Sequence, residues 1–297
     1  MLINHQNLSN LYIGFKAAFQ GGLGQAATQH EAIAMIATST TAVEQYGWLG
    51  QVPGFREWLG DRVVQNVMAH DYSIRNKDFE LTIGVPRNAI EDDQYGVYSP
   101  LFTEMGRSTA AHPSELCFAL LKNGFAQTCY DGQNFFDTDH PVIQEDGSVA
   151  SVSNSGGGSG TPWFLMDNSR AVKPIILQNR KPDQFVSKQS LTDDNVFHRK
   201  EFLFGVDNRR NVGFGLWQLA YGSKQTLDGA AYAAARAALQ EMKGDHGRPL
   251  GVMPNLLVVP PSLEGKALEI LNAERDAAGA TNVWKGTAKV LVSPLLA

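Results

Sequence analysis

Residues 79–85 alternate apolar and polar side chains with a period of about two, which is typical of a half-buried strand. The apolar positions are Phe79, Leu81, Ile83 and Val85. An earlier stretch, residues 61–69, carries three valines, and the polar, turn-prone segment 74–78 separates the two. This order predicts a long antiparallel hairpin. Because an isolated hairpin is marginal in water, it must lean on the rest of the chain or on another copy.

The N-terminal residues 1–45 show two short apolar stretches, residues 11–19 and 31–37, which we expect to be helical. The glycine-rich run 21–24 lies between them and disfavours a continuous helix, since glycine loses much backbone entropy on folding. This region is therefore predicted to be an extended or jointed arm with little stability of its own.

Residues 99–124 are predicted to form a long helix. Ser99 is a candidate N-cap with Pro100 at the first helical position, and Gly124 can end the helix. Pro113 lies inside this stretch and lacks the backbone N–H of a helical residue. We therefore expect a joint in the helix near Pro113.

The middle of the chain is predicted to be a loop followed by strands. Residues 151–160 are almost entirely Ser, Asn and Gly, which predicts a flexible surface loop that does not pack. Asp207 and Asn208 predict a turn between two later strands. The predicted strands are residues 163–166, 174–178, 185–188, 201–206 and 213–221.

The C-terminal quarter alternates helix and strand. An alanine-rich helix is predicted over 226–244 with Thr226 as its cap, and a buried strand over 256–259. A second helix, 263–273, and a last strand, 288–292, follow. Such alternation indicates a compact α/β unit.

Composition narrows the class of protein. Of the 297 residues, 43% are hydrophobic and 19% charged, which is typical of a folded globular chain. With 25 Lys and Arg against 30 Asp and Glu, the net charge of −5 argues against a tight non-specific grip on nucleic acid. The apolar runs are too short to span a membrane, and the first residues lack the features of a secretory signal. Two cysteines, Cys117 and Cys129, are expected to be free thiols.

One cluster of potential metal ligands stands out, formed by Asp137, Asp139 and His140. The segment runs into Pro141 and lacks the glycine and the distal glutamate of a calcium loop, so a hydrogen-bonded turn is the favoured interpretation. No nucleophile elbow or phosphate-binding loop occurs. We therefore predict no catalytic residue, no bound metal and no cofactor. A metal-dependent hydrolase that uses these three residues is kept as an alternative.

Several segments resemble the major head subunit of Mu-like phages and prophages, and the likeness spans nearly the whole chain. Within the matching segment Cys129–Asp137, the string Asp131–Asp137 is the specific one. The other segments include Tyr46–Gly50, Glu57–Arg62, Glu91–Asp93, Glu104–Arg107, His140–Val142, Trp163–Asp167 and Gly213–Gln218.

The resemblance implies an α+β chain with the HK97-like capsid fold. Residues 1–45 would be the N-terminal arm, and residues 46–92 the extended loop, a β-hairpin. The peripheral domain, 93–222, would contain a long spine helix at about 99–128 and a sheet from the strands of 135–222. The axial α/β domain would be 223–297.

The resemblance also implies a function without catalysis. The chain would be a major capsid protein that self-assembles into hexamers and pentamers of an icosahedral shell around double-stranded DNA. It would be assembled in the host bacterial cytoplasm and reside in the virion, with no membrane contact. Its expected partners are further copies, a scaffold or protease, the portal and a decoration protein, with weak, sequence-blind contact to DNA. Another assembling component, such as a tail or decoration protein, is a second alternative.

Contacts between subunits are expected to come from the extended loop. Its apolar side chains would be buried on an adjacent subunit or on the subunit's own spine helix. Lys77, near the predicted hairpin tip, has no identifiable partner for an isopeptide bond, so we predict no covalent crosslink. The candidate contact residues are Phe55, Trp58, Phe79, Leu81, Ile83 and Val85.

Overall fold

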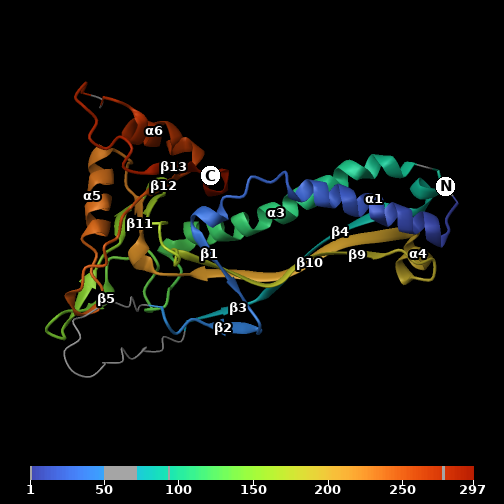
Figure 1. Ribbon diagram of the computed structural model, residues 1–297, viewed down its shortest axis with the longest axis horizontal. Coiled ribbons are helices and arrows are strands. Elements are labelled where there is room, and N and C mark those ends of the chain that lie inside the picture. Colours follow the sequence, from blue (N-terminus) through green and yellow to red (C-terminus); the bar gives the residue numbers. More distant parts are fainter. Residues whose placement is uncertain (1, 50–71, 93, 276–277) are drawn as a thin grey trace.

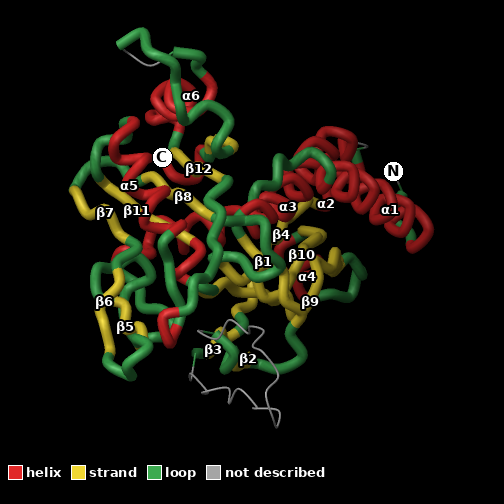
Figure 2. The backbone as a smooth tube through the Cα atoms, turned by 60° about the vertical axis from the view of Figure 1, so that its left-hand side comes forward, coloured by secondary structure: helices red, strands yellow, loops and turns green. Residues whose placement is uncertain are grey.

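The computed structural model describes residues 2–49, 72–92, 94–275 and 278–297 (Figure 1). The molecule is elongated, with two long helices over a sheet at one end and a second sheet flanked by helices at the other (Figures 1 and 2). Phe55, Trp58 and the predicted strand 61–69 lie outside the described residues.

The first sheet has four strands in the order β1-β9-β10-β4. Its centre is an antiparallel pair of long strands, β9 (Ile175–Lys188) and β10 (Glu201–Phe214), connected through the short helix α4 (Asp194–Arg199). On one side β1 (Ala34–Thr38) runs parallel to β9, and on the other β4 (Lys77–Pro86) runs antiparallel to β10.

Two helices cover one face of this sheet, α1 (His5–Leu23) and α3 (Ser99–Lys122) (Figure 1). Phe15 of α1 stacks on Phe102 of α3 with ring centroids 4.1 Å apart, and meets Phe204 of β10 edge-on at 5.1 Å. These aromatic contacts lie within a hydrophobic core between the two helices and the sheet.

The second sheet has five strands in the order β13-β12-β8-β11-β7 and belongs to a larger core. Every residue of β8 and β12 is buried, because these two strands pair in the middle of the sheet. The strands are β7 (Ser155–Gly158), β8 (Trp163–Met166), β11 (Ala220–Lys224), β12 (Leu256–Val259) and β13 (Lys289–Val292), and the helices are α5 (Gly229–Gln240) and α6 (Glu264–Asn272).

Short elements complete the described chain. Two antiparallel ribbons pair β2 (Val43–Gln45) with β3 (Ser73–Arg75), and β5 (His140–Ile143) with β6 (Val149–Val152). Helix α2 spans Arg87–Glu91. Single 3-10 turns are η1 (His30–Ala32), η2 (Gln94–Tyr98), η3 (Asn123–Phe125), η4 (Trp217–Leu219), η5 (Asp245–Gly247), η6 (Pro261–Leu263) and η7 (Pro294–Leu296).

The strand at residues 79–85 is present as β4, whereas its predicted hairpin partner, 61–69, lies outside the described residues. Strand β4 pairs with β10, with Val85 opposite Phe202 and Phe79 opposite Asn208. This arrangement buries Val85 and half-buries Ile83 in the core that also contains residues of α1 and α3. Just before β4 in the chain, β3 pairs with β2.

The N-terminal region is more regular than predicted. Helix α1 continues through Gly21 and Gly22 and packs on α3. The predicted helix at 31–37 is wrong, because residues 34–38 form β1 and pair with β9. Pairing with a distant strand here overrides the local helical pattern.

The long helices lie close to their predicted positions, but the predicted joint in α3 and the predicted cap of α5 differ from the structure. Helix α3 passes through Pro113 without ending, so the expected break is absent. The cap of α5 is Asp228, whose side chain accepts a hydrogen bond from the Ala231 N–H at 2.8 Å, and not Thr226.

Two predictions for the middle of the chain are wrong. Asp207 and Asn208 make no turn; they lie inside β10, where the pairing with β9 is irregular. The Ser/Gly-rich stretch is not a free loop, because β7 pairs with β11. A Cβ on Gly156 would lie 2.5 Å from the Ser223 Oγ, so glycine permits this close approach.

The sheet of residues 135–222 is also divided differently. Strands β7, β8 and β11 belong to the same sheet as the C-terminal β12 and β13. The expectation that they join the sheet next to the long helix is wrong. Strand β8 is apolar on both faces and needs a central position, which β11 and β12 provide.

Candidate functional site

Four of the predicted contact residues lie on β4, and they point mainly into their own subunit. Val85 is fully buried, and Ile83 is half-buried against the same core. The ring of Phe79 meets the ring of His112 on α3 edge-on, with centroids 4.4 Å apart. Leu81 is 39% exposed, and it is the member of the set with the most surface to offer a neighbour.

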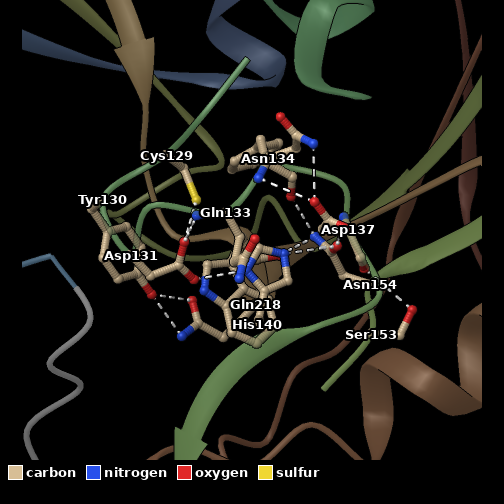
Figure 3. A network of polar contacts seen from close by, with 12 residues as sticks. Cys129, Tyr130, Asp131, Gln133, Asn134, Asp137, His140, Ser153, Asn154 and Gln218 are labelled. Atoms are coloured by element: carbon tan, nitrogen blue, oxygen red, sulfur yellow. Dashed lines mark hydrogen bonds and ion pairs between the residues drawn. The ribbon is translucent and has the colours of Figure 1, made fainter. Parts of the chain in front are cut away.

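The most densely connected polar site lies in the specific string Cys129–Asp137 and the residues that follow it (Figure 3). His140 is fully buried at the start of β5, and its ring stacks on Trp217 with centroids 3.9 Å apart. Its Nδ1 lies 2.7 Å from Asp131 Oδ2. Cys129 Sγ donates to the other carboxylate oxygen, Oδ1, at 3.1 Å.

Asn154 holds the opposite side of this site. Its Oδ1 accepts from the Asp137 backbone N–H at 3.0 Å and lies 3.2 Å from His140 Nε2. Its Nδ2 group donates to the backbone carbonyls of Phe135, Trp217 and Ala220. One side chain therefore joins the loop before β5 to the entry into β11.

Asp137, Asp139 and His140, the three residues of the alternative metal site, do not converge on one point. The Asp137 carboxylate accepts from the backbone N–H of Asn134 and of Thr138, which makes it the centre of a turn. Asp139 is exposed, and His140 faces Asp131. The favoured interpretation, a hydrogen-bonded turn, is confirmed.

Sequence reasoning missed Asp131, Cys129 and Asn154 as members of the site. Asn154 stands in a Ser/Gly-rich stretch, where no local pattern distinguishes a buried amide from a solvated one. The available signal was the family string itself, which contains Cys129 and Asp131 and ends just before His140.

Burial and hydrogen bonds shift the acidity of the groups in this site. Burial raises the pKa of Asp131, but hydrogen bonds from His140 and Cys129 outweigh it, so the pKa lies below its ordinary value. Burial and the neighbouring Asp131 charge raise the pKa of the Cys129 thiol, and burial raises that of Cys117 to about 12. Both cysteines are free, and in the absence of a bound cation burial disfavours the thiolate form of each.

Comparison with known proteins places the chain in a family. The model of the family described as Mu-like prophage major head subunit gpT matches residues 8–296. The chain belongs to this family. This chain, called the head subunit below, is 43% identical to the major capsid protein of Escherichia phage Mu over 305 aligned positions, which cover 100% of both chains.

Solved capsid structures agree with this assignment. The head subunit superposes on a chain of the bacteriophage JBD30 procapsid with a TM-score of 0.87 and 45% identity, covering 99% of this chain and 100% of the other. A JBD30 capsid decorated with minor capsid protein trimers gives a TM-score of 0.79 at 37% identity, with 94% of each chain covered.

These matches confirm the predicted family, the α+β HK97-like capsid fold and the predicted function. The head subunit is a major capsid protein, a structural component of the virion and not an enzyme. The comparisons do not favour a hydrolase, a tail protein or a decoration protein. None of the helices in the described part of the chain has the length and apolarity to cross a bilayer.

Proposed function

We propose that the head subunit assembles into hexamers and pentamers of an icosahedral shell that encloses double-stranded DNA. The observation that carries this proposal is its full-length likeness to a chain taken from an assembled particle. Assembly then takes place in the host bacterium, with a scaffold or protease and the portal as partners. A decoration protein is a further proposed partner, since the JBD30 particle carries minor capsid protein trimers.

The four-stranded sheet with α1 and α3 corresponds, in this proposal, to the peripheral domain, with α3 as its spine. The five-stranded sheet with α5 and α6 corresponds to the axial domain. Of the proposed extended loop, 46–92, residues 50–71 lie outside the described residues, and residues 77–86 form β4 of the four-stranded sheet.

The subunit leaves large apolar side chains uncovered at its ends, as a protein completed by neighbours does. Phe197 on α4 is 77% exposed, Val97 near the start of α3 is 72% exposed, and Val283 beyond α6 is 73% exposed. Helices α4 and α6 stand at opposite ends of the molecule (Figure 1). Burial of such side chains supplies about 25 cal/mol for each Å² of apolar surface removed from water.

The interior of the proposed shell must hold DNA without immobilising it. The net charge of −5 supports weak contacts that do not depend on sequence. A strong, salt-resistant and sequence-specific complex in a gel shift is the result that contradicts this part of the proposal.

Electron microscopy of the expressed full-length chain tests assembly directly. We expect capsomers, spheres or tubes for the wild type and a clear loss of them for Phe197→Ser. Asp194→Ser, at an exposed polar position of the same helix, is the matched control and should assemble normally. Folded material that stays monomeric at every concentration would contradict the proposal.

A further inference from the structure

Three metal-binding side chains converge in the buried site next to β5. One donor atom each from Cys129, Asp131 and His140 lies within 4.8 Å of the others. The side chain of His140 is fully buried, and that of Asp131 is 6% exposed. All three belong to one loop that ends at β5, and they face one another in Figure 3.

The orientation of Asn154 fixes which nitrogen of His140 carries a proton. The Asn154 Nδ2 group donates to three backbone carbonyls, so Oδ1 is the atom that faces His140 Nε2. An amide oxygen only accepts, and Nε2 must therefore be the donor of this contact. In a neutral imidazole, Nδ1 then has a lone pair and no proton.

That lone pair points at a second acceptor. His140 Nδ1 and Asp131 Oδ2 are 2.7 Å apart, and two lone pairs at this distance repel each other. A proton between Nδ1 and Oδ2, or a metal ion in its place, removes this repulsion.

We propose that Cys129, Asp131 and His140 form a zinc-binding site of the head subunit. A thiolate, a carboxylate and an imidazole are together a donor set that suits Zn²⁺, whereas Ca²⁺ and Mg²⁺ prefer oxygen donors. The hydrogen bond from His140 Nε2 to Asn154 is the outer contact by which proteins orient a metal-binding histidine. Stacking on Trp217 holds the same ring from its face.

The surroundings allow an ion to enter. A cavity of about 200 Å³ adjoins the site and is lined by Asp131 itself, together with Tyr130, Trp217 and Gln218. It gives access to the Asp131 side of the site and has room for a water molecule as the fourth ligand. Around tetrahedral zinc, donors lie roughly 3.3 to 3.6 Å apart, given bond lengths of about 2.0 to 2.3 Å. The separations of 2.7 and 3.1 Å seen here therefore open by about half an ångström on binding.

Binding releases two protons for each ion. One leaves the Cys129 thiol, which becomes a thiolate, and the other is the proton between His140 and Asp131. The ion then joins the beginning of the loop to the start of β5 and restrains the joint between β5 and the five-stranded sheet.

Metal analysis of the purified full-length subunit tests the proposal. After loading with zinc sulfate and dialysis into metal-free buffer, we expect one zinc ion per chain. Loading with Co²⁺ should give a thiolate-to-cobalt charge-transfer band in the near ultraviolet. Cys129→Ser, whose hydroxyl can still donate to Asp131, should lose both the ion and the band. Cys117→Ser is the matched control, since Cys117 is the other buried free thiol, and it should retain both.

If a variant folds poorly, the effect of zinc on the melting temperature provides a second test. Zinc should raise the melting temperature of the wild type and of Cys117→Ser, a chelator should reverse the rise, and Asp131→Asn should weaken zinc binding at least tenfold. Wild-type protein that holds no zinc after loading, or Cys129→Ser that binds as well as the wild type, would overturn the proposal. Either result would mean that a proton lies between His140 and Asp131.

Discussion

Asn154 shows how much of this subunit depends on single buried polar residues. Its side chain is fully buried and connects the loop before β5 with η4 and β11. Inside a protein, such a network is stabilising only when every member has a partner. Removal of one amide here leaves several backbone groups and His140 Nε2 unpaired.

We expect Asn154→Ala to lower the free energy of unfolding by about 2 to 4 kcal/mol, because it unpairs buried polar groups and leaves a cavity. Urea denaturation of the purified subunit measures this. Asn134→Ala removes one side-chain hydrogen bond to Asp137 at a half-buried position, and should cost about 1 kcal/mol. Equal losses in the two variants would show that Asn154 has no special role.

At the level of elements, the contact between α1 and α3 depends on two glycines. A Cβ on Gly106 would lie 2.0 Å from the Phe19 carbonyl oxygen, and one on Gly22 would lie 1.9 Å from that of Thr103. The two helix backbones thus approach more closely than any side chain permits. A Cβ on Gly14, on the same helix α1, would instead point into open space, with nothing to contact within 4 Å among the described residues.

Gly106→Ala should therefore destabilise the subunit by about 1 to 3 kcal/mol, since the helices must move apart. Gly14→Ala should instead stabilise it by up to about 1 kcal/mol, because alanine favours a helix and nothing is displaced. Thermal unfolding of both variants beside the wild type checks the difference in sign. A neutral Gly106→Ala would show that the helices separate without cost.

The contact between β4 and α3 makes stability depend on pH. Burial, and then the nearby Arg210 charge, lower the pKa of His112, and the pKa of His30 shifts in the same direction, mainly through burial. A group whose pKa is lower in the folded state stabilises fully above its unfolded value. That contribution is lost as the pH falls through the lowered pKa.

We therefore expect the free energy of unfolding to fall as the pH drops below about 6.5, the ordinary value for histidine. His112→Gln should flatten this dependence, as measured by urea denaturation at a series of pH values. His5→Gln, at an exposed position, should leave it unchanged. A His112→Gln curve parallel to that of the wild type would contradict the assignment.

For the molecule as a whole, α3 links the two cores, as the long strands β9 and β10 also do. Phe102 and Met105, near its start, lie in the core under α1, while Cys117 and Phe118 lie in the core of the five-stranded sheet. One continuous helix thus connects both cores of the elongated subunit.

We expect the assembled shell to hold together without covalent links between subunits. Lys77 is exposed at the start of β4, and the sequence identifies no partner for it. Boiling mature particles in SDS should give a single band of monomer size. A ladder of larger bands would contradict this, and Lys77→Arg would then show whether Lys77 forms the link.

The sequence alone determined the elements whose signals are local. The apolar run at 163–166 became a strand with the predicted ends, and the run at 256–259 did the same. The helix beginning at Ser99 and the alanine-rich helix were also recognised, because periodicity and composition act over a few residues. The resemblance of the string ending at Asp137 to the Mu-like head-subunit family predicted the function.

Tertiary structure decided everything that depends on distant partners. It paired β4 with β10, made residues 34–38 a strand, and recruited the glycines of β7 into a sheet. It also brought Asn154 to His140 and Asp131, which no spacing in the chain indicates. The physical reason is that strand pairing and burial of polar groups are settled by the free energy of the whole packed core, whereas local patterns record only what a segment prefers by itself.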